Sequence, residues 1–286
     1  MNILTLASRN VYRNWQRSLV TTLAMAFACT IMIVFATLMA GMVQGSKHNA
    51  VAMNNGDIQL HVQGYRDDPD IYAMIPKAFE LVRKFRTNEF YATTRLHVFG
   101  LMASDESSAG VHLRGIDLEY EKTVTEIHKH LQTGLWLNAT DSHGVVIGKK
   151  LARSLDVLLG DELVFIGQTA DGFMANDLFK VRGILKTETP SIDSSGIFIS
   201  NAALQALISL PNGAHEIALM RKNRRSDLTV AQAKITAIVK EVAADDFSNI
   251  EVMSWRQLMP IISRFLETAE VQTLIMLAFT YIAVAS

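Results

Sequence analysis

Apolar and polar positions divide the chain into three stretches of different character. Residues 19–43 (LVTTLAMAFACTIMIVFATLMAGMV) form an unbroken apolar run, and no charged residue occurs between Ser18 and Ser46. Its 25 residues make about 37 Å of helix, which exceeds the roughly 30 Å hydrocarbon core of a bilayer. The pattern therefore predicts a transmembrane helix over residues 18–46.

Two kinds of cleaved leader are the alternatives for this run. A signal peptide has an apolar region of only about 7–15 residues, which is much shorter than residues 19–43. A lipoprotein signal would use Cys29 after Ala26-Phe27-Ala28, but the helical pattern continues past that cysteine. The run is therefore interpreted as a retained membrane span.

A second apolar run lies at the other end of the chain. Residues 271–286 (VQTLIMLAFTYIAVAS) carry no charge, and at 1.5 Å per residue they make about 24 Å of helix. Because this is short of the roughly 30 Å core, we interpret residues 268–286 as the incomplete start of a second transmembrane helix. A fragment of a longer chain is the favoured explanation, and a short helix buried against partner helices is the alternative.

Between these runs, residues 47–267 alternate strand-like and helix-like patterns. Strands are expected over 56–63, 90–102, 110–115, 144–147, 162–168, 179–185, 197–200, 215–221 and 250–254. Helices are expected over 76–86, 118–131, 149–158, 201–210, 229–244 and 255–267. This order predicts an α+β domain, with an inserted strand-rich subdomain at about residues 160–200.

The charges follow the same division. Overall, 49% of residues are apolar, 19% are charged, the net charge is −1 and the mean hydropathy is +0.19. All 28 acidic residues lie between Asp57 and Glu270, and 23 basic residues accompany them. This stretch therefore has the charge content of a soluble domain and a net charge of −5. The balance argues against a nucleic-acid partner, and a single cysteine excludes a disulfide framework.

Three arginines precede the first apolar run, and they indicate its orientation. Arg9, Arg13 and Arg17 are spaced i, i+4, i+8, while only Lys47 follows the run closely. The positive-inside rule then puts the N-terminus in the cytoplasm and the domain on the periplasmic side of a bacterial inner membrane. Residues 1–17 are expected to form a cytoplasmic amphipathic helix anchored to the membrane surface by these arginines, or the arginines serve only as topology signals.

Motifs for catalysis or metal binding are weak. Residues 144–150 (GVVIGKK) are one residue short of a phosphate-binding loop, and Lys150 takes the place of its Ser or Thr. His215-Glu216 lacks the second histidine of a zinc-protease helix, because position 219 is Leu. His61, His97, His112 and His143 are dispersed, with no pattern that would bring them together. We expect no enzyme activity in this chain, no metal site and no cofactor.

Several stretches resemble motifs of one family, in the same order and at the same spacing. The chain resembles bacterial ABC transporter permeases with a MacB-type periplasmic core domain, in the FtsX-like permease superfamily, and within it the lipoprotein-releasing permeases. The matching stretches are residues 6–14 (LASRNVYRN), 56–69 (GDIQLHVQGYRDDP), 144–161 (GVVIGKKLARSLDVLLGD), 179–187 with Asp193, and Trp255 before the second apolar run.

This resemblance implies a fold of porter-like α/β layers with an inserted strand-rich subdomain, between transmembrane helices. It also implies that ATP is hydrolysed by a separate cytoplasmic ABC ATPase dimer, and that a second permease subunit forms a homo- or heterodimer with this chain. The cargo would be a lipoprotein or another membrane lipid, released with the help of a periplasmic carrier or adaptor. A MacB-like efflux permease of a tripartite system, or a non-transport FtsX-like protein that signals to or activates hydrolases, are the alternatives.

Two groups of residues are the expected contacts in such a transporter. Met25, Met32, Phe35 and Met39 approximate one helical stripe that could face an acyl chain, and ordinary helix packing or lipid exposure is the alternative. Members of the lipoprotein-releasing subgroup grip a carrier with a proline-containing hairpin, and the matching tip here has no proline. The residues expected to contact a periplasmic partner at this tip are Gln168, Asp171, Phe173 and Asp177.

Overall fold

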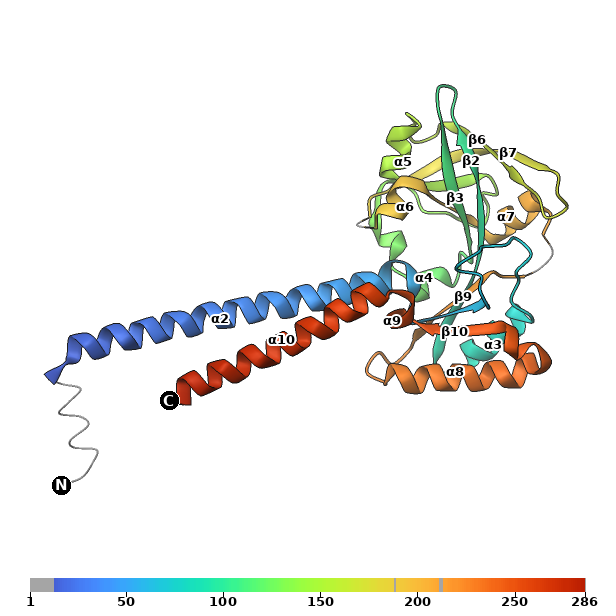
Figure 1. Cartoon of the computed structure of the whole chain (residues 1–286). Coiled ribbons are helices and arrows are strands. Elements are labelled where there is room, and N and C mark those ends of the chain that lie inside the picture. The colour runs from blue at the N-terminus through green and yellow to red at the C-terminus, as the bar shows by residue number, and fades with distance from the viewer. Residues whose placement is uncertain (1–12, 188, 211–212, 286) are drawn as a thin grey trace. The chain divides into compact units, whose positions relative to one another are not determined.

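The computed structural model describes residues 13–187, 189–210 and 213–285, and these form two compact units (Figure 1). One unit holds the chain up to His48 and from Pro260 onward, and the other holds Asn49–Met259. Residues 1–12, which include Arg9 and most of the expected cytoplasmic helix, lie outside the described residues.

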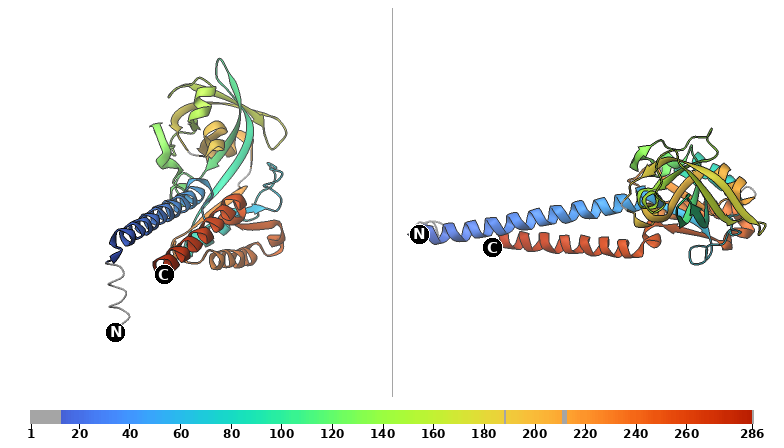
Figure 2. Two further views of the ribbon diagram at one scale, coloured as in Figure 1. Left: turned by 60° about the vertical axis from the view of Figure 1, so that its left-hand side comes forward. Right: turned by 90° about the horizontal axis from the view of Figure 1, so that it is seen from above.

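The first unit is a pair of long helices, α2 (Trp15–Ala50) and α10 (Pro260–Ala285), which lie side by side in both figures (Figures 1 and 2). Among the described residues, one helical stretch is long and apolar enough to cross a membrane, Trp15–Val43. The partly shielded residues of α2 recur at spacings of three and four, as in a seam between two packed helices. They are Cys29, Met32, Ala36, Met39 and Val43, and Ser18 is a further partly shielded residue near the start of the helix.

The second unit is built on ten strands that form one mixed sheet, ordered β10-β1-β9-β2-β3-β8-β5-β7-β4, with β6 paired to both β2 and β7. The strands are β1 (Ile58–Val62), β2 (Phe90–Ala103), β3 (Ser108–Ile116), β4 (Leu131–Gly134), β5 (Gly144–Gly148), β6 (Glu162–Gln168), β7 (Met174–Leu185), β8 (Gly196–Ser200), β9 (Glu216–Arg221) and β10 (Ile250–Ser254). The fold is therefore α+β, as the alternating pattern predicts.

Within this sheet, six strands close into a ring, because β2, β3, β8, β5, β7 and β6 each pair with the next and β6 pairs back to β2. Strands β9, β1 and β10 continue the sheet beyond β2, and we call these three strands the extension. Strand β4 pairs with β7 at the opposite edge. The strands of the expected insert, β6 and β7, are thus part of the same continuous sheet.

Short helices cover the sheet. They are α3 (Ala78–Thr87), α4 (Glu121–Val124), α5 (Lys149–Ser154), α6 (Pro190–Ser195), α7 (Asn201–Ile208), α8 (Leu228–Ala243) and α9 (Trp255–Leu258), with single turns η1 (Val51–Asn55), η2 (Ile127–His130) and η3 (Ala244–Asn249). Helices α3 and α8 bury one core against the extension, and α5 and α7 contribute to a second core in the ring. Asp227 caps α8, because its side chain accepts hydrogen bonds from the backbone N–H groups of Thr229 and Val230.

Two helix predictions are wrong in detail. Residues 118–131 form only the short α4 and η2, and the strand β4 follows at Leu131. Three consecutive β-branched residues, 123–125, lose side-chain freedom in a helix, and Thr125 is already extended. The expected helix over 255–267 is interrupted between α9 and α10, because Pro260 has no backbone N–H and restricts the residue before it.

The long strand β2 joins the two parts of the second unit. Its first half, Phe90–Arg95, pairs with β9, and its second half, Arg95–Ala103, pairs with β3. Arg95 is therefore the residue at which β2 changes partner. The polar side chains described below gather around this position.

Candidate functional site

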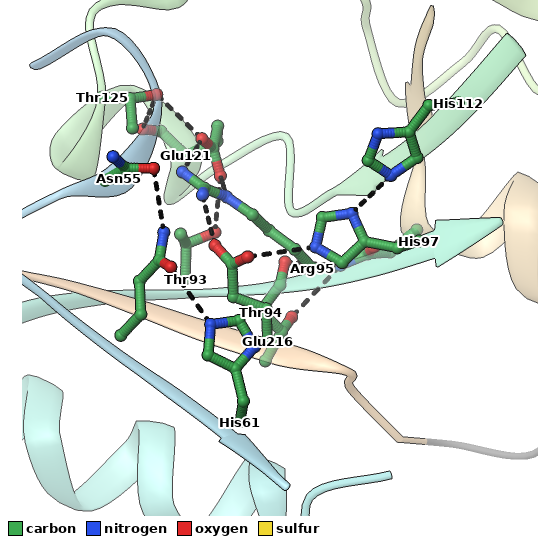
Figure 3. Close-up of polar contacts among 12 residues, drawn as sticks. Asn55, His61, Thr93, Thr94, Arg95, His97, His112, Glu121, Thr125 and Glu216 are labelled. Atoms are coloured by element: carbon green, nitrogen blue, oxygen red, sulfur yellow. Dashed lines mark hydrogen bonds and ion pairs between the residues drawn. The ribbon is translucent and has the colours of Figure 1, made fainter. Parts of the chain in front are cut away.

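A cluster of polar side chains lies on the face of the extension opposite helices α3 and α8 (Figure 3). Side chains alternate along a strand, so the apolar Ile58 and Leu60 of β1 face one core while Gln59 and His61 face the other way. We call this set the polar cluster. Its members are Gln59 and His61 from β1, Thr93, Arg95 and His97 from β2, His112 from β3, Glu216 from β9 and Glu121 from α4.

Arg95 is at the centre of the polar cluster and is 1% exposed. Its Nη1 lies 2.5 Å from Oε1 of Glu216, and its Nη2 lies 2.6 Å from Oε1 of Glu121. A further bond from Nε of Arg95 reaches the second oxygen of Glu121 at 3.1 Å. Burial by itself lowers the pKa of Arg95, but Glu121 and Glu216 together raise it, so the guanidinium stays charged.

Glu216 is held as an ion by two partners. His97 Nε2 lies 3.1 Å from its Oε2, on the side away from Arg95. Burial opposes ionisation of this carboxyl, yet Arg95 and His97 hold its pKa well below the usual range. One guanidinium thus bonds to two carboxylates, and the partly buried Arg114 supplies a second positive charge near them.

Three histidines extend the hydrogen bonds outward from Glu216. Because Glu216 is an acceptor, His97 donates from Nε2 and accepts at Nδ1 from Nε2 of His112, at 3.0 Å. His215 accepts from the backbone N–H of His97 at Nδ1 and donates from Nε2 to the carbonyl of Ile71. His97 and His215 therefore each have one donor and one acceptor nitrogen, which is the neutral form.

Burial keeps these rings neutral. It lowers the pKa of His97 to about 4, and it lowers that of His112 to about 2 with a further contribution from His97. Burial also lowers the pKa of His61 and of His215. Tyr65 stacks between these two rings, with centroids 5.8 Å from His61 and 5.4 Å from His215.

A cavity of about 200 Å³ opens beside these rings. Asn55, Tyr65, Arg66, Phe99 and several members of the polar cluster line it. Among the described residues, no three His, Cys, Asp or Glu side chains are arranged to hold a metal ion. The cluster instead joins buried polar groups of four strands and one helix, which makes it a rigid joint between the ring and the extension.

The polar cluster also reaches the segment that follows α2. The amide of Asn55 in η1 accepts from Gln59, whose own oxygen lies 3.1 Å from Nε2 of His61. The backbone carbonyl of Ala52 accepts from the N–H of Glu126, beside η2. Two further hydrogen bonds join Asp57 to the side chain of Arg221, at 2.8 and 3.0 Å. The start of the domain is thus fixed by three independent sets of contacts.

The comparison with known families decides what kind of domain this is. The MacB-like periplasmic core domain family matches residues 18–245, which is well over half of the chain. The chain belongs to this family. It therefore carries a MacB-like periplasmic core domain.

Solved structures show the same fold at low sequence identity. The periplasmic region of MacB from Actinobacillus actinomycetemcomitans is 14% identical, with a TM-score of 0.54, and the match covers 76% of this chain and 95% of that one. The extracellular domain of the noncanonic ABC-type transporter YknZ from Gram-positive bacteria is also 14% identical, with a TM-score of 0.50, and the match covers 69% and 99%. No curated protein sequence matches the chain.

The residues expected to face cargo lie at different degrees of exposure in the MacB-like chain. Met32 and Met39 belong to the partly shielded seam of α2, whereas Met25 and Phe35 are each 47% exposed. Two residues of the expected stripe are therefore partly shielded, and the other two are exposed on the surface of the helix. Arg13 and Arg17, at the start of the helix, are exposed, and Arg9 is among the residues not described.

The residues expected to contact a periplasmic partner surround the tip of the hairpin formed by β6 and β7. Thr169 and Phe173 close this tip with backbone and side-chain hydrogen bonds, and Gly172 has a positive φ of 81°. Gln168 and Asp171 are exposed, and Phe173 is 74% exposed. Asp177 is partly buried, and its carboxylate lies 3.6 Å from His143.

The expectation that the histidines are dispersed is wrong for His61, His97 and His112, which meet in the polar cluster together with His215. His143 is apart from them, beside Asp177. Each clustered histidine lies in or next to a strand that the alternating pattern predicts. The missing information was the pairing of β1, β9, β2 and β3, which brings residues more than a hundred positions apart into contact.

Proposed function

We propose that this chain is the membrane subunit of a bacterial ABC transporter, and that it passes ATP-driven motion from the cytoplasm to its MacB-like domain. Its N-terminus is cytoplasmic and its domain periplasmic. The cargo is a lipoprotein or another lipidic molecule that leaves the inner membrane. A cytoplasmic ABC ATPase dimer supplies the hydrolysis, a second permease subunit completes the pair, and a periplasmic carrier or adaptor receives the cargo.

The observation that supports this proposal most directly is the connection between α2 and the domain. Helix α2 continues to Ala50, η1 follows at once, and β1 begins at Ile58. Val51, Ala52, Met53 and Asn55 are all less than 10% exposed. A flexible linker would absorb a displacement of the helix. Here a displacement has to move buried residues, and through them the first strand of the sheet.

The polar cluster supports the same mechanism, because it resists motion between the ring and the extension. Separating Arg95 from Glu216 would leave a buried carboxylate without its main partner, which costs about 3–5 kcal/mol. The two parts of the domain therefore respond to a displacement of η1 as one body. A rigid domain is what a mechanical transmitter requires.

A lipidic cargo is favoured by the apolar helix, since acyl chains are recognised by burial rather than by hydrogen bonds. The exposed Met25 and Phe35 are available for such contacts on α2. Methionine suits varied acyl chains because its side chain is flexible and polarisable. In this proposal Met32 and Met39 become accessible to cargo when the helices of the pair separate.

Co-purification tests the proposal. The full-length protein is extracted from its native membrane in mild detergent and its partners are identified, and the ATPase rate is measured in nanodiscs. We expect a cytoplasmic ABC ATPase to co-purify and its rate to depend on the permease. A protein that migrates alone and neither binds nor stimulates any ATPase would contradict the proposal.

Mechanical coupling is tested with an insertion and a matched control. A flexible Gly-Ser segment of about four residues is inserted between Asn55 and Gly56, where it should absorb motion. The same segment is inserted in the exposed turn between Asp105 and Glu106 as the control. We expect the first insertion to abolish transport while ATPase binding persists, and the second to have little effect.

A deletion strain distinguishes the kinds of cargo. Lipoproteins retained in the inner membrane support the lipidic cargo. Loss of drug resistance with normal lipoprotein sorting indicates an efflux permease. Co-purification dominated by cell-wall hydrolases, with neither transport defect, indicates a signalling or hydrolase-activating protein.

A further inference from the structure

One loop of the domain concentrates positive charge in a protein body that is otherwise acidic. The segment between β9 and α8 reads RKNRRSD over residues 221–227 and has four basic and one acidic residue. The whole stretch from Asp57 to Glu270 has a net charge of −5. Residues 222–227 of this loop are all exposed. We call residues 221–227 the basic loop.

Hydrogen bonds hold the basic loop in one conformation with two arginines at its tip. The carbonyl of Asn223 accepts from the backbone N–H of Ser226 at 3.2 Å and from its hydroxyl at 2.8 Å. The side chain of Asn223 accepts from the backbone N–H of Arg225 at 3.1 Å. This is a turn with Arg224 and Arg225 at its two central positions.

The other charges around the loop already have partners. Arg221 pairs with Asp57, and Lys234 pairs with Glu89 at 2.8 Å. The carboxylate of Asp227 caps α8. By contrast, no carboxylate among the described residues pairs with the side chain of Arg224 or Arg225. The two arginines therefore present unneutralised charge on a rigid turn.

The register of the sheet places this turn at a particular end of the domain. Ile58, at the start of β1, pairs with Ser254 at the end of β10 and with Leu219 near the end of β9. The chain thus enters and leaves the domain at the same end of the sheet at which β9 leads into the basic loop. We call this end the junction end. Arg256 in α9, one residue after the start of that helix, adds another exposed positive charge there.

Helix length relates the junction end to a membrane. The stretch suited to crossing a bilayer ends at Val43, and α2 continues for seven more residues to Ala50. Seven residues of helix rise about 10 Å, which is close to the Debye length of about 8–10 Å at physiological salt. Only this short helical stretch and η1 therefore separate the apolar stretch from the junction end along the chain.

We propose that Arg224 and Arg225 dock the domain on the anionic phospholipid headgroups of the membrane that α2 crosses. The guanidinium fork fits phosphate with paired hydrogen bonds, and each arginine near an anionic surface strengthens the attachment by about fivefold. Such docking is a second attachment of the domain to the bilayer, in addition to its connection through α2. This inference rests on the membrane anchor in the proposed function and on no particular cargo.

The test uses the full chain in nanodiscs of two compositions, phosphatidylcholine alone and phosphatidylcholine with about one third phosphatidylglycerol. Cys29 is replaced by Ala, and a donor dye is placed at Val230→Cys, a position that is 56% exposed beside the loop. Acceptor dyes on a trace of lipid headgroups report the distance from the dye to the bilayer by energy transfer. We expect higher transfer with phosphatidylglycerol, and loss of the difference at about 0.5 M NaCl.

Two charge variants complete the test. We expect Arg224→Gln/Arg225→Gln to give the phosphatidylcholine value in both nanodiscs. The matched control is Lys150→Gln/Arg153→Gln, which removes two exposed charges from α5 and should behave as the wild type. Equal transfer in both compositions for the wild type, or an unchanged response in Arg224→Gln/Arg225→Gln, would overturn the inference. A chain that fails to enter either nanodisc contradicts the membrane anchor itself.

Discussion

Arg95 and Glu216 are directly opposite each other in β2 and β9, and their charged groups are 2.5 Å apart. Both side chains are buried, with 1% and 8% of their surface exposed. The pair lies at the residue where β2 leaves β9 for β3. A buried ion pair thus joins β2 and β9 at the last position of their pairing, where the pairing of β2 with β3 begins.

The first prediction concerns this pair. Arg95→Met removes the cation and leaves Glu121 and Glu216 as buried carboxylates without their main partner. A broken buried pair costs about 3–5 kcal/mol, so we expect the free energy of unfolding to fall by that amount. Urea unfolding of the purified protein, followed by tryptophan fluorescence, measures the change.

A compensated variant provides the control for this prediction. Arg95→Met/Glu121→Gln/Glu216→Gln has no buried charge among these three residues, and we expect it to recover a large part of the loss. If the triple variant is less stable than Arg95→Met, hydrogen-bond geometry rather than charge dominates the cluster.

The second prediction is a loss of stability in acid. The folded-state pKa of His97 is about 4 and that of His112 about 2, whereas both are near 6.5 when unfolded. Below the pKa of the unfolded state, the unfolded chain binds protons that the folded chain does not. The contribution of these histidines to the free energy of unfolding is therefore fully present above about pH 7 and falls as the pH drops toward about 4. Each such histidine contributes up to about 1.4 kcal/mol per pH unit.

Glu216 acts in the same direction. Its pKa is lowered in the folded state, so its contribution is present above the unfolded value and is lost as the pH falls further. Urea midpoints measured between about pH 7 and about pH 5 should therefore fall steeply in the wild type, and less steeply in His112→Gln. The exposed His143→Gln is the control and should keep the wild-type slope. A flat profile in the wild type would show that the rings are solvated.

The third prediction concerns the backbone at the junction end. Gly56 has a positive φ of 67°, and a Cβ there would lie 2.7 Å from the carbonyl oxygen of Leu219. Because that oxygen also accepts the N–H of Asp57, it is not free to move. We expect Gly56→Ala to destabilise the domain by about 2–3 kcal/mol in thermal or urea unfolding.

Gly110→Ala is the matched control for this substitution. It lies in β3, and nothing is within 4 Å of the position that its Cβ would take. We expect a change of less than about 0.5 kcal/mol. Similar losses in the two variants would show that general glycine effects, and not the contact with Leu219, set the stability.

Much of this fold is predictable from the sequence, because alternation and helical spacing are local properties. The strand at 56–63 and the helix at 229–244 are examples, since apolar positions alternate in the strand and buried positions recur at helical spacing in the helix. The first apolar run needs only length and hydropathy. The family resemblance, which supplied the domain type, came from motifs along the chain and not from any single residue.

Local sequence patterns do not predict the polar cluster or the closed ring of strands. His61, His97 and His112 look like ordinary polar positions on strands until β1, β9, β2 and β3 are placed side by side. Strand pairing depends on contacts between distant segments, and one sequence does not specify them. The same is true of the basic loop, whose composition is visible in the sequence but whose place at the junction end follows from the register of β9.

The fourth prediction tests the orientation of α2. In a Cys29→Ala background, Ser107→Cys places a thiol in the exposed turn between β2 and β3, and Asn14→Cys places one before the span. Positive charge before the span favours a cytoplasmic N-terminus. We expect a membrane-impermeant maleimide to label Ser107→Cys in cells with a permeable outer membrane, and Asn14→Cys only after the inner membrane is opened. The reverse pattern would place the domain in the cytoplasm.

The fifth prediction concerns the tip of the hairpin of β6 and β7. Phe173 is 74% exposed on a tip that hydrogen bonds hold closed, so its ring is available to a periplasmic partner without local unfolding. An aromatic ring at the centre of an interface contributes strongly to binding, often more than about 2 kcal/mol. We expect Phe173→Ser to leave the unfolding temperature unchanged and to weaken the release of cargo to a carrier or adaptor.

Leu158→Ser is the matched control, because Leu158 is 73% exposed and lies outside this tip, between α5 and β6. A photo-reactive amino acid at each of the two positions measures contact in cells, and cross-linked partners are identified by mass spectrometry. We expect a soluble periplasmic protein to be captured from position 173 and not from position 158. Equal capture at both positions, or full transport by Phe173→Ser, would mean that the hairpin tip is not where the partner binds, and the search would move to the remaining exposed strands of the ring.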